Sequence, residues 1–102
     1  MVSAEELGLI VEEAWSSLVN TEWTGTAQDF IRIVNDIAIP MIVKIYRPPS
    51  GELSEKLVKK AYGLAELIQG EWEKVIESEF NEDVMAQWFE NIINYLLNLE
   101  DI

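Results

Sequence analysis

The sequence contains no cysteine and no histidine among its 102 residues. Without cysteine it forms no disulfide and offers no thiolate for nucleophilic catalysis, iron–sulfur clusters or zinc. Without histidine it lacks the usual general base at neutral pH, the Ser–His–Asp triad and most transition-metal sites. Any catalysis would depend on carboxylates, Lys, Tyr, Ser or Thr, and carboxylates holding Mg²⁺ would be its natural form.

Basic residues are scarce as well. Seven Lys and Arg stand against 19 Asp and Glu, which gives a formal net charge of −12. This charge argues against direct nucleic-acid binding, because phosphate contacts need Lys and Arg. Hydrophobic residues still make up 49% of the chain, which is too many for wholesale disorder. The length fits one domain, so we expect a single acidic domain spanning residues 1–102.

No hydrophobic run is long enough to cross a membrane. The most apolar stretch, residues 30–46, has 17 residues and is interrupted by four charged or proline positions. A membrane-spanning helix needs about 20 residues with almost no charge. Residues 1–6 carry no positive charge ahead of an apolar segment, so we predict no signal peptide. We expect a soluble cytoplasmic protein without membrane contact.

The N-terminal segment predicts an amphipathic helix. Ser3 and Glu6 form an S-x-x-E capping box at the start of a helix from about Ala4 to Val19. Apolar residues at three- and four-residue spacing define its inner face: Leu7, Ile10, Val11, Ala14 and Leu18. The polar segment 20–26 contains Gly25 and is predicted to be a loop.

A second helix should begin at Thr26, a suitable N-cap, with Asp29 favouring the helix dipole in the first turn. This helix is apolar over most of its circumference, so it should be the most buried. Pro40 should kink it, because proline removes a backbone donor and clashes with the carbonyl four residues earlier. Alternatively, the helix ends near Ala38 and residues 41–46, rich in strand formers, are extended. We favour the kinked helix because a single short strand has no evident partner.

The segment 47–51, Arg-Pro-Pro-Ser-Gly, is the strongest break in the chain and lies almost at its midpoint. A third helix should start within residues 52–55, with Ser50 or Ser54 as its N-cap. It would reach Glu79 if unbroken. The proline turn therefore divides the chain into two pairs of helices.

Two glycines in the third helix need an explanation, because each costs about 1 kcal/mol in a helix interior. Gly63 and Gly70 are seven residues apart and share one face of the helix. Close approach of a neighbouring helix is one explanation. A break near Gly70 is the other.

A fourth helix should begin after Asn81, a good N-cap, and run to about Leu99. Its inner face is predicted to contain Met85, Phe89, Ile92 and Leu96. Two helical hairpins joined by a proline turn predict an all-α fold. We expect an antiparallel four-helix bundle whose second helix is kinked at Pro40.

Charge is segregated along the sequence. Residues 1–31 carry six acids and no base, residues 32–60 carry six bases and three acids, and residues 61–102 carry ten acids and one base. The densest acidic block surrounds the expected junction of the third and fourth helices: Glu71, Glu73, Glu77, Glu79, Glu82 and Asp83. Only Lys74 offsets it, and acids at a helix C-terminus oppose the helix dipole. The block is either a solvated face that aids solubility or a recognition surface for a basic partner.

A second set of candidate contact residues is apolar. Four tryptophans are many for this length, and the fourth helix has a wider apolar arc than one bundle core needs. The candidate apolar interface comprises Trp15, Trp23, Trp88, Ile93 and Leu97. It would form a homodimer or fit a partner groove. The alternative is that the tryptophans seal the ends of the bundle.

One short pattern resembles the motif of a known family, and the acids of a second family's motif are differently spaced here. Residues 23–25, Trp-Thr-Gly, form a W-x-G tripeptide that resembles the motif of small secreted helical-hairpin proteins. Those proteins place it near mid-chain and carry an acid four residues after a C-terminal tyrosine, where this chain has Leu99 after Tyr95. Helical nucleotide pyrophosphohydrolases use E-x-x-E and E-x-x-D pairs on adjacent helices. The N-terminal acids do not match that spacing: Glu6, Glu12 and Glu13.

These patterns favour a non-enzymatic acidic protein–protein interaction module that binds a basic protein and uses no cofactor or metal ion. Candidate roles are a small inhibitor, an immunity or antitoxin-like protein, or a virus- or plasmid-encoded antagonist of a basic nucleic-acid-processing enzyme. One alternative is a homo-oligomeric structural or assembly subunit with an apolar contact. Another is a carboxylate-based Mg²⁺ enzyme that hydrolyses a nucleotide.

Overall fold

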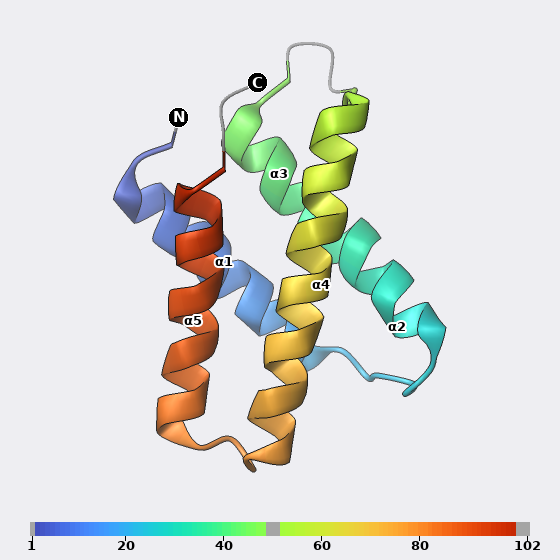
Figure 1. The fold of residues 1–102 in the computed structure, drawn as a ribbon, viewed down its shortest axis with the longest axis vertical. Coiled ribbons are helices and arrows are strands. Elements are labelled where there is room, and N and C mark those ends of the chain that lie inside the picture. Colours follow the sequence, from blue (N-terminus) through green and yellow to red (C-terminus); the bar gives the residue numbers. More distant parts are fainter. Residues whose placement is uncertain (1, 49–51, 100–102) are drawn as a thin grey trace.

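The computed structural model describes residues 2–48 and 52–99, and its regular structure within these ranges is entirely helical. The elements are α1 (Ala4–Asn20), α2 (Ala27–Arg32), η1 (Ile33–Ala38), α3 (Ile39–Tyr46), α4 (Glu55–Glu77) and α5 (Glu82–Leu97) (Figure 1). α2, η1 and α3 follow one another without a gap and form one kinked helix, so the fold has the four helices that the sequence predicts. None of the helices in the described ranges is long and apolar enough to cross a membrane.

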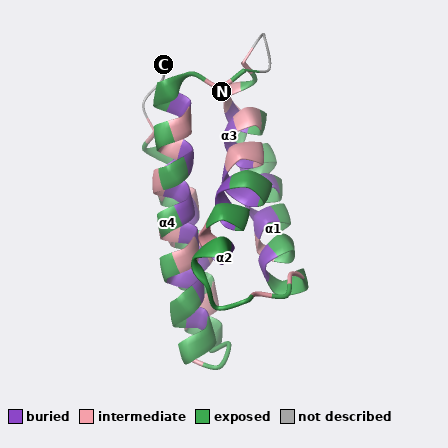
Figure 2. Cartoon of the chain, turned by 90° about the vertical axis from the view of Figure 1, so that its right-hand side faces the viewer, coloured by how far each residue is buried: buried purple, intermediate pink, exposed green. Residues whose placement is uncertain are grey.

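The helices pack in two layers with the core between them. α4 and α5 lie side by side and antiparallel along the long axis, and α1 and the kinked helix lie obliquely behind them (Figure 1). Figure 2 shows that the buried faces of the helices point inward between the layers. The molecule measures 41 × 29 × 19 Å. Its two helical hairpins are therefore α1 with the kinked helix, and α4 with α5.

α1 begins and packs as its sequence predicts. The Ser3 side chain accepts a hydrogen bond from the Glu6 N–H (3.2 Å), and all five residues of the predicted inner face are buried. The Glu6 carboxylate accepts a hydrogen bond from Arg47 Nη2 at the end of α3 (2.7 Å). The capping serine therefore starts α1, and the glutamate links α1 to the kinked helix.

A π-helical turn produces the kink that Pro40 predicts. In η1 the Ile39 N–H bonds to the Val34 carbonyl, five residues back instead of four, which widens the helix. The ring of Pro40 would collide with the Asp36 carbonyl in a regular helix, and a wider turn ahead of the proline relieves that collision. α3 continues as a helix to Tyr46, so the alternative of an extended segment at 41–46 is wrong.

α4 runs without a break along the whole molecule. The Ser54 side chain caps it by accepting the Leu57 N–H (3.3 Å), and the helix ends at Glu77. The other predicted cap, Ser50, lies outside the described residues. At 1.5 Å per residue, its 23 residues span about 35 Å. α4 therefore links the two ends of the molecule.

The two glycines of α4 have different surroundings. A Cβ atom at Gly63 would lie 2.6 Å from the Tyr95 hydroxyl of α5, so this glycine permits close approach of the Tyr95 side chain. The same hydroxyl donates a hydrogen bond to the Lys60 carbonyl (3.3 Å). A Cβ atom at Gly70 would meet nothing within 4 Å, and the helix continues through that residue. Close approach therefore explains Gly63 only.

The connection between α4 and α5 is a tight turn built without glycine. The Phe80 N–H bonds to the Val75 carbonyl (2.9 Å). The Glu79 N–H bonds to the Ile76 carbonyl (3.0 Å), which completes the Schellman pattern at the end of α4. Glu79 and Phe80 have left-handed φ angles of 56° and 60°, where glycine is favoured. Asn81 then caps α5, as predicted.

An aromatic cluster joins α1 to the α4–α5 hairpin. The Trp15 ring lies 5.5 Å from Trp72 and 5.2 Å from both Trp88 and Phe89. Trp88 is fully buried, and its Nε1 donates a hydrogen bond to the Ile68 carbonyl (3.3 Å). Edge-on and tilted aromatic pairs add about 0.5–1.5 kcal/mol each beyond their burial. Aromatic packing therefore braces the half of the bundle that leads to the α4–α5 turn.

Candidate protein-interaction surface

Five of the six predicted acids are exposed where α4 meets α5, at the lower end of the molecule in Figure 1. We call this set the acidic corner: Glu73, Glu77, Glu79, Glu82 and Asp83. Among residues 2–48 and 52–99, no Lys or Arg forms an ion pair with any of them. The acidic corner is therefore strongly negative, and Lys74, which pairs with Glu71, is the one base within it among the described residues.

Glu71, the sixth predicted acid, is not part of this surface. It is 8% exposed, and its carboxylate accepts a hydrogen bond from Lys74 Nζ (3.1 Å). Its position on α4 explains the burial, because Ile68 three residues before and Val75 four residues after are both fully buried. Glu71 is therefore removed from the candidate contact residues, and it also engages the one base within the acidic segment.

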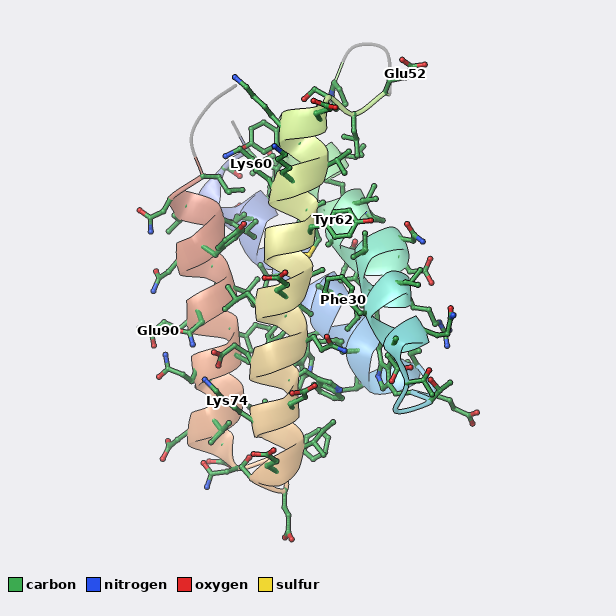
Figure 3. The ribbon with its side chains drawn as sticks, turned by 45° about the vertical axis from the view of Figure 1, so that its right-hand side comes forward. Phe30, Glu52, Lys60, Tyr62, Lys74 and Glu90 are labelled. Atoms are coloured by element: carbon green, nitrogen blue, oxygen red, sulfur yellow. The ribbon has the colours of Figure 1, made fainter. Side chains whose placement is uncertain are left out.

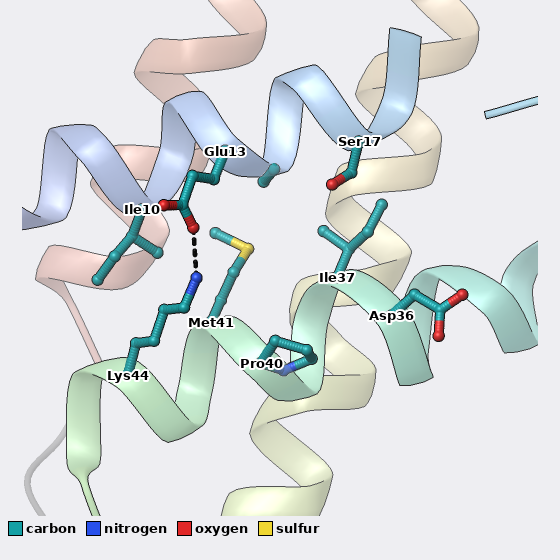
Figure 4. Close-up of a pocket in the computed structure, with 9 residues that line it drawn as sticks. Ile10, Glu13, Ser17, Asp36, Ile37, Pro40, Met41 and Lys44 are labelled. Atoms are coloured by element: carbon teal, nitrogen blue, oxygen red, sulfur yellow. Dashed lines mark hydrogen bonds and ion pairs between the residues drawn. The ribbon is translucent and has the colours of Figure 1, made fainter. Parts of the chain in front are cut away.

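Two acids of α1, towards the opposite end of the molecule, are paired with bases. Glu6 of α1 pairs with Arg47 at the end of α3 (2.7 Å), and Glu13 pairs with Lys44 of α3 (Figure 4). We call these four residues the matched end. Three further lysines lie within residues 56–60, in the first turns of α4, and Figure 3 shows one of them near the upper end of that helix. Most of the bases in the described residues therefore lie in α3 and the first turns of α4, away from the acidic corner.

The hollow beside Glu13 and Lys44 is too small for a nucleotide. Its volume is about 50 Å³, and it lies between α1 and the kinked helix at Pro40 (Figure 4). Ligand pockets usually start near 300 Å³. No group of three or more acids in the described part of the chain is placed to hold a metal ion. This hollow therefore adds no support to the Mg²⁺ hydrolase hypothesis.

Trp23 closes the C-terminal end of α1. Its Nε1 donates a hydrogen bond to the Leu18 carbonyl (2.8 Å), one of the carbonyls that a helix end leaves without an intrahelical donor. The Arg32 guanidinium lies 5.8 Å from the centre of the Trp23 ring, within cation–π range. The ring is half-buried, so it seals the bundle end and also contributes to the surface.

Asp29 organises the loop that leads from Trp23 into α2. Its carboxylate accepts hydrogen bonds from the Thr24 N–H (2.9 Å), the Thr24 hydroxyl (2.7 Å) and the Gly25 N–H (2.7 Å). These donors, the Thr24 N–H first, lower the pKa of Asp29 below its ordinary 3.8, against the raising effect of burial. Gly25 supplies the φ of 74° that the turn requires. Sequence reasoning assigned Asp29 to the helix dipole and missed this role.

The five predicted apolar contact residues do not form one exposed surface. Trp88 is 0% exposed, so its assignment to an interface is wrong. Trp15, Trp23 and Ile93 are half-buried. Leu97 is 57% exposed. Only Leu97 of this set is therefore largely available for contact.

The inward face of α5 is rotated from the predicted one. Trp88, Ile92 and Leu96 are buried, whereas Met85 and Phe89, both predicted on the inner face, are half-buried. The apolar arc of α5 is so wide that helical spacing alone does not select its inward part. Turning the large Trp88 ring inward removes the most apolar surface from water, which explains the choice.

An apolar feature that the sequence analysis did not identify adjoins the acidic corner. Ile76 and Phe80 are 48% and 46% exposed, and the Phe80 ring lies edge-on to Trp72 at 5.7 Å. A groove of about 300 Å³ begins beside them, and we call it the tryptophan groove. Its walls include Trp23, Asp29, Ile33, Trp72, Glu73 and Ile76. The one sign of this feature in the sequence is Phe80, an apolar residue in an otherwise acidic segment.

Comparisons with known proteins return no relative of this chain. No protein-family model matches the sequence, and neither the curated proteins nor the solved structures contain a significant match.

Proposed function

We propose that the chain is a non-enzymatic interaction module and that its acidic corner binds a basic surface on a partner protein. The observation that carries the proposal is the exposure of five acids without a base to neutralise them, at the end of the molecule opposite the matched acids. Surfaces of one sign attract oppositely charged partners and accelerate their association.

Apolar residues beside the acids support this proposal. Ile76 and Phe80 are about half exposed, next to Glu77 and Glu79. Protein interfaces combine an apolar, aromatic-rich centre with a polar rim, and this arrangement supplies both parts. The roles that fit are a small inhibitor, an immunity or antitoxin-like protein, or a virus- or plasmid-encoded antagonist of a basic nucleic-acid-processing enzyme.

A pull-down from the native host at low and high salt tests the proposal. The bound partner should be lost as ionic strength rises, since salt screens exposed charges. The triple reversal E73K/E77K/E79K should weaken binding at least about tenfold, because each rim contact adds a fraction of the binding free energy. The matched control is E12K/E66K/E90K, which makes the same charge change at exposed positions scattered over α1, α4 and α5. Equal binding by the two variants would overturn the proposed site.

A homo-oligomeric assembly subunit is the second candidate. Leu97 of α5 is 57% exposed, and half-buried Ile93 lies four residues before it on the same helix face. A second copy packed on this face would bury both side chains. Light scattering over a wide concentration range tests it: Leu97→Gln should shift any dimer towards monomer. A wild-type chain that stays monomeric at high concentration contradicts this candidate.

A further inference from the structure

The tryptophan groove has the form of a pocket for one side chain. Trp23 from the loop, Ile33 from the kinked helix, and Trp72 and Ile76 from α4 provide its apolar walls. Its volume of about 300 Å³ lies at the lower limit of ligand pockets, which suits a single bulky group better than a cofactor. The walls come from three separate elements, so the bundle itself holds the groove in shape.

An exposed apolar strip continues the groove towards the turn. Ile76 is both a wall of the groove and 48% exposed, and Phe80 one turn further is 46% exposed. The Phe80 ring contacts Trp72, which lines the same groove. Contiguous exposed apolar groups next to a concave site mark binding surfaces more often than isolated ones do.

The rim of the groove carries negative charge. Glu73 lines it, and Glu77 and Glu79 lie on the adjoining turns without an ion pair among the described residues. Two bases lie nearby: Lys74 pairs with Glu71, and Arg32 lies over the Trp23 ring. A negative rim favours an occupant with positive charges on both sides of its apolar group and disfavours nucleic acid or an anionic membrane.

We infer that the tryptophan groove receives one large apolar side chain, aromatic or long aliphatic, from a Lys/Arg-rich segment of the partner. This inference rests on the proposed function, because the same segment would place its basic residues on the acidic corner. The groove then supplies a buried anchor, and the corner supplies charge complementarity around it.

Two synthetic peptides test the inference, KRKAWAKRK and KRKAAAKRK, which differ only in the central residue. At low salt the Trp peptide should bind at least about tenfold more tightly than the Ala peptide, because burying an aromatic side chain improves the affinity by more than about tenfold. The side-chain indole N–H signals of the protein report the position. The indole signals of Trp23 and Trp72, which line the groove, should shift. The indole signal of buried Trp88 should stay unchanged.

A matched pair of variants locates the anchor. Ile76→Ser removes an exposed wall of the groove, whereas Ile31→Ser removes an equally exposed isoleucine from α2 outside it (48% and 49% exposed). I76S should abolish the preference for the Trp peptide, and I31S should retain it. Both positions face solvent, so neither substitution empties a core site.

The outcomes separate the inference from the proposed function. Equal affinity for both peptides would overturn the groove inference and leave the acidic corner as the binding surface. Indole shifts that grow with protein concentration without peptide would assign the groove to a second copy and overturn the inference. Failure of both peptides to bind at low salt would overturn the inference and the proposed function together.

Discussion

The two ends of the molecule differ in the ion pairing of their acidic side chains. At the matched end, Glu6 and Glu13 each pair with a base of the kinked helix, whereas no acid of the acidic corner forms an ion pair within the described residues. Exposed ion pairs contribute only about 0–1 kcal/mol, so their absence costs the corner little stability. The difference matters for recognition, since unmatched charge stays available to a partner.

The corner is held by packing instead of charge. Trp15, Trp72 and Trp88 interlock across α1, α4 and α5, and the Phe80 ring extends the contact to the turn. The turn places Glu79 and Phe80 at left-handed φ angles, although glycine would be less strained there. Strained backbone conformations of this kind are frequent at functional sites. Stability and recognition therefore use different residues at this end.

Removing the Trp88 ring should have the largest effect on folding. Trp88→Ala empties a fully buried site in the cluster that braces the corner, so the free energy of unfolding should fall by about 3–5 kcal/mol. Urea denaturation followed by circular dichroism measures the change, and Trp88→Phe should lose less. A loss below about 1 kcal/mol would contradict the claim that aromatic packing holds this end.

Asp29→Asn should weaken the fold at neutral pH, with an effect that fades in acid. Because folding lowers the pKa of Asp29, its contribution is complete well above the ordinary value of 3.8. It is lost as the pH falls through the lower folded-state pKa. The difference in Tm between wild type and D29N should therefore shrink as the pH drops below 3.8. A pH-independent difference would show that the charge of Asp29 is irrelevant to the loop.

Glu79→Gly should stabilise the chain by about 1 kcal/mol, because glycine accepts the φ of 56° without steric strain. Glu73→Gly is the control: it removes the same side chain from the interior of α4 and should cost about 1 kcal/mol. Chemical denaturation compares the two. If both variants lose stability equally, the turn at the corner is unstrained.

The glycines between the two ends should respond unequally to alanine. Gly70→Ala should gain up to about 1 kcal/mol from helix propensity, because nothing occupies the space of the new methyl group. Gly63→Ala should gain less or lose stability, since it displaces the Tyr95 hydroxyl. In a Tyr95→Phe background the hydroxyl is absent, so Gly63→Ala should stabilise the chain as Gly70→Ala does. Equal gains at both sites in the wild-type background would disprove the close approach of the Tyr95 side chain to Gly63.

Breaking an ion pair at the matched end should have the smallest effect. A double-mutant cycle with Glu13→Gln and Lys44→Met should give a coupling energy of at most about 1 kcal/mol, because both side chains are about half exposed or more. Added salt should reduce it further. A coupling energy above about 2 kcal/mol would mean that charge pairing, not packing, sets the stability of that end.

Local sequence signals were sufficient for the helices. The caps Ser3, Thr26, Ser54 and Asn81 all act as their types predict, because capping depends on residues within one turn. The kink at Pro40 was equally local. The π-helical form of that kink was not predictable, since it depends on how the widened turn packs against α1 and α4.

The candidate surface was only partly predictable. The exposed acids follow from charge density alone, but the burial of Glu71 depends on the rotation of α4 about its axis. The rotation of α5, and with it the burial of Trp88, depends on tertiary packing in the same way. The tryptophan groove joins a loop residue, Trp23, to Trp72 and Ile76 of a distant helix, and no local pattern records that contact.

The position at which a basic peptide binds shows whether the acidic corner is the recognition surface. Backbone amide shifts of the labelled protein, titrated with KRKAAAKRK at low salt, would compare acids at both ends in one experiment. The shifts should be concentrated in residues 73–83, vanish in E73K/E77K/E79K and persist in E12K/E66K/E90K. Shifts of equal size at the matched end, or spread over all exposed acids, would contradict this expectation.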